Sequence, residues 1–255
     1  MEVFDAVGFT IFDIPGYFFF AGVGFVAMVS VFIILVSEKK YSLPKNLFTL
    51  VVASIFAVIF ARLFGCISGM YKDLGIGKQI GIEDIKQTGI VYYGGLIGFI
   101  MSYSFIRKLF HEDRYILDVL ATCIPLFHAI SRIGCFTGGC CYGVESKSCF
   151  AIRYKTRVFN DIVTVNRIPI QLIEATINFI MFLYLFHLIK NENWKRKHIL
   201  RQYLAIYSIV RFFIEFFRGD SARGVVCGIS FSQIISVIIW IYLLIIILNG
   251  HNKKE

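Results

Sequence analysis

The sequence has no internal repeat, no low-complexity tract and no polar linker long enough to separate two folded domains. Nor does it show a cleavable signal sequence, because the first apolar run lacks both a basic segment before it and a small-residue cleavage site. We therefore expect a single integral membrane domain over residues 1–255. The first apolar run should remain in it as a helix.

Polar residues are scarce, and apolar ones dominate the composition. Hydrophobic residues make up 57% of the chain, a share well above that of soluble domains, and 27 of them are Phe. Seven apolar runs can cross a hydrocarbon core of about 30 Å as helices. They cover residues 17–36, 47–64, 90–105, 116–133, 170–189, 200–217 and 229–248. The sequence thus predicts an all-α polytopic membrane protein with seven transmembrane helices.

Positive charge is absent from the segment before the first helix and concentrated in alternate loops. Lys and Arg follow the first, third and fifth predicted helices and also end the chain. The positive-inside rule then places the N-terminus outside and the C-terminus in the cytoplasm. Residues 65–89 and 134–169 become external loops, and residues 1–16 are expected to lie on the outer interface. The net charge of +9 suits anionic lipid headgroups, and no pattern indicates nucleic acid.

Three arginines fall at the outer ends of predicted helices: Arg62, Arg132 and Arg211. A charge inside a membrane costs at least a few kcal/mol unless it reaches the interface or finds a partner. Snorkelling to the interface explains one such residue more readily than three. An anionic ligand shared in the outer leaflet would explain all of them.

A glycine-rich reversal follows Arg132 and includes Gly139 and Gly143. Glycines let the backbone approach a ligand closely, so the stretch suits a phosphate, although a helix-end anchor and a turn would give the same pattern. His128 precedes Arg132 by four residues and shares its helix face, which fits either a chemical role or helix packing.

Arg211 and Glu215 are also four residues apart on one helix. Such a pair lowers the cost of holding both charges in lipid. It could equally orient Arg211 toward a ligand.

The seven cysteines divide into two groups. Three lie in or beside predicted helices and are expected to act as small apolar fillers: Cys66, Cys123 and Cys227. Four would lie at or beyond the outer surface, where a disulfide is permitted: Cys135, Cys140, Cys141 and Cys149. Cys135, Cys140 and Cys141 could ligate zinc together with His128, but their spacing fits no usual zinc pattern. We therefore expect no metal and no cofactor.

Four motifs carry a resemblance to a known family. They are Tyr-Gly-Gly-Leu-Ile-Gly at residues 93–98, Arg132-Ile-Gly-x-Phe-x-x-Gly139-x-x-Tyr-Gly143, Pro169-x-Gln171-Leu-x-Glu174 and Arg211-Phe-x-x-Glu215-Phe-x-Arg218. In order and spacing they resemble the prolipoprotein diacylglyceryl transferase family. The match runs from about residue 17 to residue 233.

The resemblance implies a seven-helix enzyme of the bacterial inner membrane. That family moves the diacylglyceryl group of phosphatidylglycerol onto the lipobox cysteine thiol of a preprolipoprotein, and glycerol phosphate leaves. The implied partners are phosphatidylglycerol, the signal peptides of preprolipoproteins and the lipid bilayer.

The resemblance also implies roles for single residues. Arg132 and Arg211 would bind the phosphate, with Glu215 orienting Arg211. The remaining lipid-binding positions are Tyr17, Arg62, Gly94, Gly95, Gly139 and Gly143.

The chain departs from the family pattern at three positions. Tyr93 stands where the family usually has a histidine, Cys135 stands in place of Asn, and Cys140 in place of an acidic residue. A neutral tyrosine is a weak base, so either His128 or a Tyr93 activated by a nearby arginine would take the thiol proton. Other readings stay open: a protein that binds or transports an anionic lipid, transfer to another acceptor, or an enzyme whose own cysteines react.

Overall fold

The computed structural model describes residues 3–75, 89–158, 161–220 and 225–251. The chain is mostly helical and forms two compact units. The first unit comprises Met1–Ile34, Val119–Ile199 and Phe213–Asp220. The second comprises Leu35–Asp118, Leu200–Phe212 and Ser221–Glu255.

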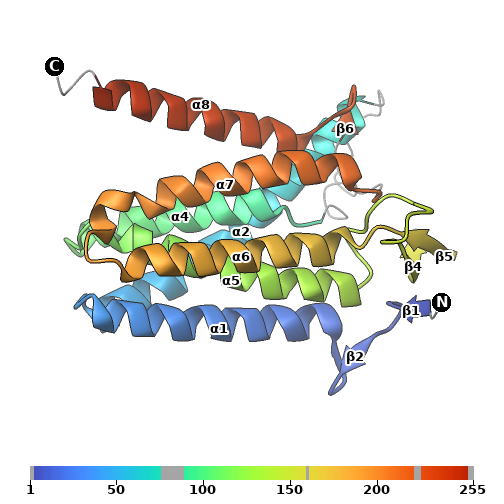
Figure 1. Cartoon of the computed structure of the whole chain (residues 1–255), viewed down its shortest axis with the longest axis horizontal. Helices are drawn as coiled ribbons and strands as arrows, with labels where there is room; N and C mark the ends of the chain where they lie inside the picture. Colours follow the sequence, from blue (N-terminus) through green and yellow to red (C-terminus); the bar gives the residue numbers. More distant parts are fainter. Residues whose placement is uncertain (1–2, 76–88, 159–160, 221–224, 252–255) are drawn as a thin grey trace. The chain divides into compact units, whose positions relative to one another are not determined.

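All seven predicted helices are present, with shifted ends (Figure 1). They are α1 (Gly16–Glu38), α2 (Leu43–Gly75), α4 (Tyr92–Leu109), α5 (Ile116–Thr137), α6 (Ile170–Lys190), α7 (Ile199–Ile214) and α8 (Phe231–His251). Within the described part of the chain, five helices are long and apolar enough to cross a membrane: α1, α2, α5, α6 and α8.

α2 and α5 continue into segments that were predicted to be external loops. α2 continues past Phe64 to Gly75, so residues 65–75 of the expected loop 65–89 are helical, and residues 76–88 lie outside the described part of the chain. Gly65 lies within α2. Because it has no side chain, the backbone of Gly89 can approach the helix closely there. α5 likewise continues to Thr137, which makes residues 134–137 helical.

In the first unit, α1 and α5 pack closely and run antiparallel. An added Cβ at Gly134 would lie 3.0 Å from the Tyr17 carbonyl, and one at Gly24 would lie 3.1 Å from the Phe127 carbonyl. Glycines at the contact permit this backbone approach, as is common between membrane helices. α6 packs against α5 through the polar contacts described below.

A three-stranded sheet also belongs to the first unit. β4 (Ile152–Val158) pairs in parallel with β1 (Val3–Asp5) and antiparallel with β5 (Asp161–Arg167). The N-terminal segment therefore contributes strands, with a hairpin of β2 (Thr10–Ile11) and β3 (Ile14–Pro15) after β1. The Phe4 ring packs on Phe136 and Tyr154, which fastens the sheet to the end of α5.

In the second unit, α2 and α4 pack antiparallel. Gly94 and Gly98 face Phe60 on α2, and the Tyr103 hydroxyl at the other end donates to Asn46 Oδ1 at 2.6 Å. The glycines that open α4 thus serve close helix packing.

The remaining helices of this unit are also tied by specific bonds. The Asp118 carboxylate accepts from the Leu200 amide at 2.7 Å and so caps the first turn of α7, after the short helix η1 (Trp194–Lys197). Trp240 on α8 donates to the Ser208 hydroxyl of α7 at 2.9 Å. β6 (Val225–Val226) and β7 (Ile229–Ser230) form a hairpin just before α8.

Candidate functional site

Arg132 is a buried charge of the first unit with contacts to three side chains. Its Nε donates to His128 Nε2 at 3.1 Å, its Nη2 lies 3.0 Å from Glu174 Oε1, and its Nη1 lies 3.9 Å from Cys135 Sγ. Only 6% of Arg132 is exposed. All three nitrogens of the guanidinium are therefore engaged, which fixes its plane relative to α5 and α6.

Glu174 supplies the compensating charge from α6. Its carboxylate is buried and also lies 3.4 Å from His128 Nε2. A buried ion pair of this kind is costly to break, because removal of one partner leaves an uncompensated charge worth about 3–5 kcal/mol. In the sequence, Glu174 shares a helix face with Gln171, but its contact with Arg132 depends on how α5 and α6 pack.

His128 lies one turn before Arg132, as the four-residue spacing predicts. Because Nε2 accepts from the Arg132 Nε, the neutral ring carries its proton on Nδ1 in this arrangement. Nε2 also lies 3.4 Å from Glu174 Oε1, so a proton added there would lie between the guanidinium and the carboxylate. The role of His128 in proton transfer stays a prediction.

The turn after α5 is held by backbone bonds. Gly139 has a left-handed φ of 71°, and Gln171 on α6 donates to the Cys140 carbonyl at 2.8 Å. An added Cβ at Gly143 would collide with the Ile168 carbonyl. These glycines permit close backbone approach within the turn, and their role toward a lipid stays a prediction. Tyr17, likewise predicted to bind lipid, packs against the glycines of α5.

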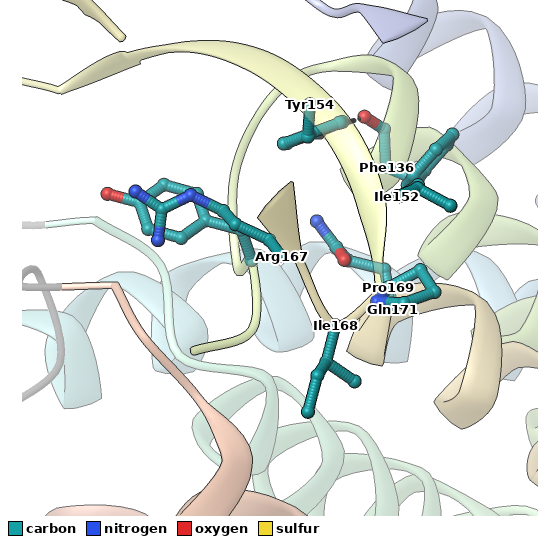
Figure 2. A pocket seen from close by; sticks show the side chains of 8 residues that line it. Phe136, Ile152, Tyr154, Arg167, Ile168, Pro169 and Gln171 are labelled. Atoms are coloured by element: carbon teal, nitrogen blue, oxygen red, sulfur yellow. Dashed lines mark hydrogen bonds between the residues drawn. The ribbon is translucent and has the colours of Figure 1, made fainter. Parts of the chain in front are cut away.

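Arg167 braces the far side of this turn (Figure 2). Its Nη1 donates to the Gly143 carbonyl at 3.3 Å, and its guanidinium stacks 4.2 Å from the centre of the Tyr142 ring. Burial raises the pKa of Tyr142, while the positive charge of Arg167 opposes that rise. The small pocket here is lined by side chains that also pack the turn, among them Tyr142, Tyr154 and Gln171.

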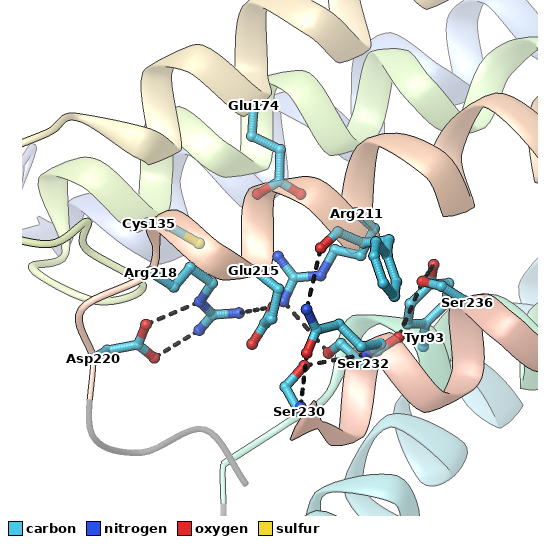
Figure 3. Close-up of polar contacts among 12 residues, drawn as sticks. Tyr93, Cys135, Glu174, Arg211, Glu215, Arg218, Asp220, Ser230, Ser232 and Ser236 are labelled. Atoms are coloured by element: carbon cyan, nitrogen blue, oxygen red, sulfur yellow. Dashed lines mark hydrogen bonds and ion pairs between the residues drawn. The ribbon is translucent and has the colours of Figure 1, made fainter. Parts of the chain in front are cut away.

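A second charged group in the first unit lies on the segment after α7. Arg218 binds the Asp220 carboxylate through two nitrogens, at 2.9 Å and 2.6 Å, and lies 3.7 Å from Glu215 (Figure 3). Glu215 begins the 3-10 turn η2 (Glu215–Phe217). Two carboxylates thus flank Arg218, a pairing that the sequence did not assign to this arginine.

The second unit holds two of the predicted catalytic residues, Arg211 and Tyr93. Arg211 lies in the last turn of α7, is 4% exposed, and its Nη2 lies 3.5 Å from Ser232 Oγ. The Tyr93 hydroxyl lies 2.7 Å from Ser236 Oγ (Figure 3). The Tyr93 ring packs edge-on to the ring of Tyr207. Neither Ser232 nor Ser236 was assigned a role from the sequence, although two serines one turn apart in an apolar helix form a polar stripe.

Three other predicted lipid-binding residues also lie in this unit. Gly94 and Gly95 pack against α2, Gly95 near Ala57 and Ala61. Arg62 is exposed and lies inside α2, so its expected position at the end of a helix is wrong. The cause is the continuation of α2 to Gly75. The roles of these three residues toward a lipid stay predictions.

A comparison with protein families assigns the chain to a family. Residues 6–249 match the family model described as prolipoprotein diacylglyceryl transferase. The chain belongs to the prolipoprotein diacylglyceryl transferase family. The match covers nearly every element described above, including both units.

Individual relatives agree with this assignment. A phosphatidylglycerol–prolipoprotein diacylglyceryl transferase of Finegoldia magna is 30% identical over 239 residues, 92% of this chain and 91% of the relative. A protein of the same name, number 2, from Clostridium perfringens is 28% identical over 229 residues, 89% and 88% of the two chains. A relative so named in Clostridium botulinum is 30% identical over 225 residues, 86% and 85%. These names favour an enzyme of this family over a lipid-binding or transport protein.

Proposed function

We propose that this chain transfers the diacylglyceryl group of phosphatidylglycerol to the lipobox cysteine thiol of prolipoproteins. The observation that carries the proposal is the buried Arg132, held by His128 and Glu174 in apolar helices of a chain that belongs to the transferase family. An arginine oriented in this way can recognise the planar array of phosphate oxygens with two hydrogen bonds.

The chain is proposed to lie in the bacterial plasma membrane as one domain with seven spans. The apolar helices α1, α2, α5, α6 and α8 support a multi-pass arrangement, and α4 and α7 would complete the seven. The Lys and Arg residues after the first, third and fifth helices support an external N-terminus and a cytoplasmic C-terminus. Residues 1–16 would lie on the outer interface, beside external loops near 65–89 and 134–169.

In the transfer step, the acceptor sulfur forms a bond to the terminal glyceryl carbon of the lipid. The carbon–oxygen bond to the phosphate breaks, and its electron pair leaves on glycerol phosphate. Arg132 would stabilise the charge that grows on this leaving group, which is the dominant kind of term in such reactions. Gly139 and Gly143 would keep the neighbouring turn compact.

His128 is the proposed acceptor of the thiol proton. When the lipid phosphate draws the Arg132 guanidinium toward itself, the lone pair of His128 Nε2 would be released from Arg132 Nε. Binding of the lipid would thus free His128 to act as the base. Glu174 would remain beside both residues and balance the imidazolium that forms.

Arg211 and Tyr93 of the second unit are also proposed to act in transfer. Arg211 would bind phosphate, with Glu215 orienting it, and Tyr93 would serve as a hydrogen-bonding group at the position of the family histidine. Ser232 and Ser236 support the proposal, because each contacts one of these two side chains.

Complementation tests the function as a whole. In a bacterial strain depleted of its own transferase, the unaltered chain should restore growth and lipoprotein processing. Arg132→Ala should fail, while Arg153→Ala, which alters an exposed arginine of β4, should succeed. Membrane immunoblots establish equal amounts of each variant. Failure of the unaltered chain, or rescue by Arg132→Ala, would contradict the proposal.

A further inference from the structure

Three thiols gather where α5 ends. The Sγ atoms of Cys135, Cys140 and Cys141 all lie within 4.8 Å of one another. Cys135 is in the last turn of α5, and Cys140 and Cys141 follow in the turn that leaves it. None of the three forms a disulfide. One short segment therefore presents three sulfur donors to a common point.

The backbone holds these thiols in place. The Cys140 amide donates to the Cys135 carbonyl at 3.1 Å, and Gln171 donates to the Cys140 carbonyl at 2.8 Å. Cys141 has a φ of 56°, a left-handed conformation that is unfavourable for a residue with a Cβ and persists only where its surroundings impose it. This conformation turns its side chain back toward the other two, which the spacing in the sequence does not reveal.

The donor set suits a soft cation. Thiolates select Cu(I) and Zn(II) among the common metal ions. Zinc in proteins takes four ligands, with sulfurs about 3.8 Å apart at a bond length of about 2.3 Å. Among the described residues this group contains three ligands and no fourth His, Asp or Glu. Cu(I) is satisfied by two or three sulfurs, so the cluster fits that ion better.

The charges around the cluster are also favourable. Arg132 Nη1 lies 3.9 Å from Cys135 Sγ, and Arg218 interacts electrostatically with Cys141. A monovalent ion held by two or three thiolates carries a net negative charge, which these guanidiniums offset. Cys135 is buried, whereas Cys140 and Cys141 are half-buried.

We propose that Cys135, Cys140 and Cys141 form a binding site for one Cu(I) ion. Sulfur–copper bonds form as the thiols lose their protons to the solvent, and no oxidant or reductant is needed. The site does not depend on transferase activity. It replaces the expectation, drawn from cysteine spacing alone, that these residues hold no metal.

The test uses the full chain in detergent, kept reduced and anaerobic, with Cu(I) supplied from a coloured chelator that reports the ion it loses. We expect one ion per chain. Cys140→Ser combined with Cys141→Ser should abolish this uptake. The matched control replaces three thiols elsewhere, Cys66, Cys149 and Cys227, with Ser and should bind as the unaltered chain does.

A second measurement needs no variant. Copper should protect the three clustered thiols of the unaltered chain from alkylation, while exposed Cys149 should continue to react, as read by peptide mass spectrometry. The proposal is overturned if the chain takes no copper from the chelator or if the double variant binds as well as the unaltered chain. Equal alkylation of the cluster with and without copper would also overturn it. These readings involve no lipid, so their failure leaves the transferase proposal intact.

Discussion

Arg132 Nη2 and Glu174 Oε1 lie 3.0 Å apart, and both side chains are almost fully buried. The two residues come from α5 and α6, so the contact joins two helices of the first unit. Because an unpaired buried charge is costly, this ion pair explains how the chain holds a charged arginine among apolar helices.

Glu174→Gln should lower both stability and transfer. The substitution keeps the shape but leaves the Arg132 charge without a buried counter-charge, so we expect a loss of about 3–5 kcal/mol in unfolding free energy. Thermal unfolding in detergent measures it. Glu145→Gln is the matched control, since Glu145 lies 3.3 Å from Arg167 with its own side chain 63% exposed, and should change little. Equal effects of the two substitutions would contradict the assigned role of Glu174.

His128 can be tested by two substitutions that separate its proposed roles. Gln retains an acceptor for the Arg132 Nε but cannot act as a base, so His128→Gln should lower kcat by about 10²–10⁴-fold with little change in KM. His128→Ala loses both functions and should also raise KM for the lipid. If His128→Gln keeps the rate and pH dependence of the unaltered enzyme, His128 only orients Arg132.

Arg211 should not be replaceable by lysine. Arg211→Ala should abolish transfer, and Arg211→Lys should retain little, because a bidentate grip on phosphate needs the planar guanidinium. Arg201→Ala, at an exposed position in the first turns of the same helix, is the control and should remain active. Full activity of the lysine variant would reduce Arg211 to a generic positive charge.

Tyr93 and Ser236 should behave as a coupled pair. Tyr93→Phe and Ser236→Ala each break the 2.7 Å contact, and each should slow transfer, whereas the double variant should be less impaired than the sum of the two. Tyr92→Phe removes another hydroxyl contact, the one to Tyr203 at 3.1 Å, and serves as the control. Purely additive losses would show that Tyr93 acts independently of Ser236. If Tyr93→Phe abolishes transfer while His128→Gln does not, the base is the tyrosine.

Copper should affect transfer only through the thiol cluster. The variant with Cys140→Ser and Cys141→Ser should keep the basal rate and lose inhibition by Cu(I), because a copper-bound Cys135 thiolate would compete with the lipid phosphate for Arg132. Transfer rates with and without Cu(I) measure this. Inhibition that persists in the double variant would place the inhibitory copper elsewhere.

The fold could be predicted largely from the sequence because seven apolar runs of membrane length are a strong signal. The ends of helices were less predictable. The second apolar run was expected to end at residue 64, but α2 continues past Gly65, which permits close contact with Gly89. Whether a glycine ends a helix or lies within a helix contact depends on what packs against it, which a single sequence does not state.

The candidate site was predictable only where its residues share one helix. The spacing of His128 and Arg132 already implied a common face, and their contact follows from it. The contact of Glu174 with Arg132 and that of Ser236 with Tyr93 join different helices, so they depend on tertiary packing. The thiol cluster depends on the left-handed backbone of Cys141, for which cysteine spacing carries no signal.

The most direct test of the transferase proposal is the intact mass of a lipobox peptide after incubation with the purified chain and phosphatidylglycerol vesicles. We predict a gain of one diacylglyceryl group on the cysteine peptide, no gain on its serine counterpart, and no gain with Arg132→Ala. An unchanged cysteine peptide in the presence of folded, membrane-reconstituted chain would contradict the account, as would equal modification of the serine peptide.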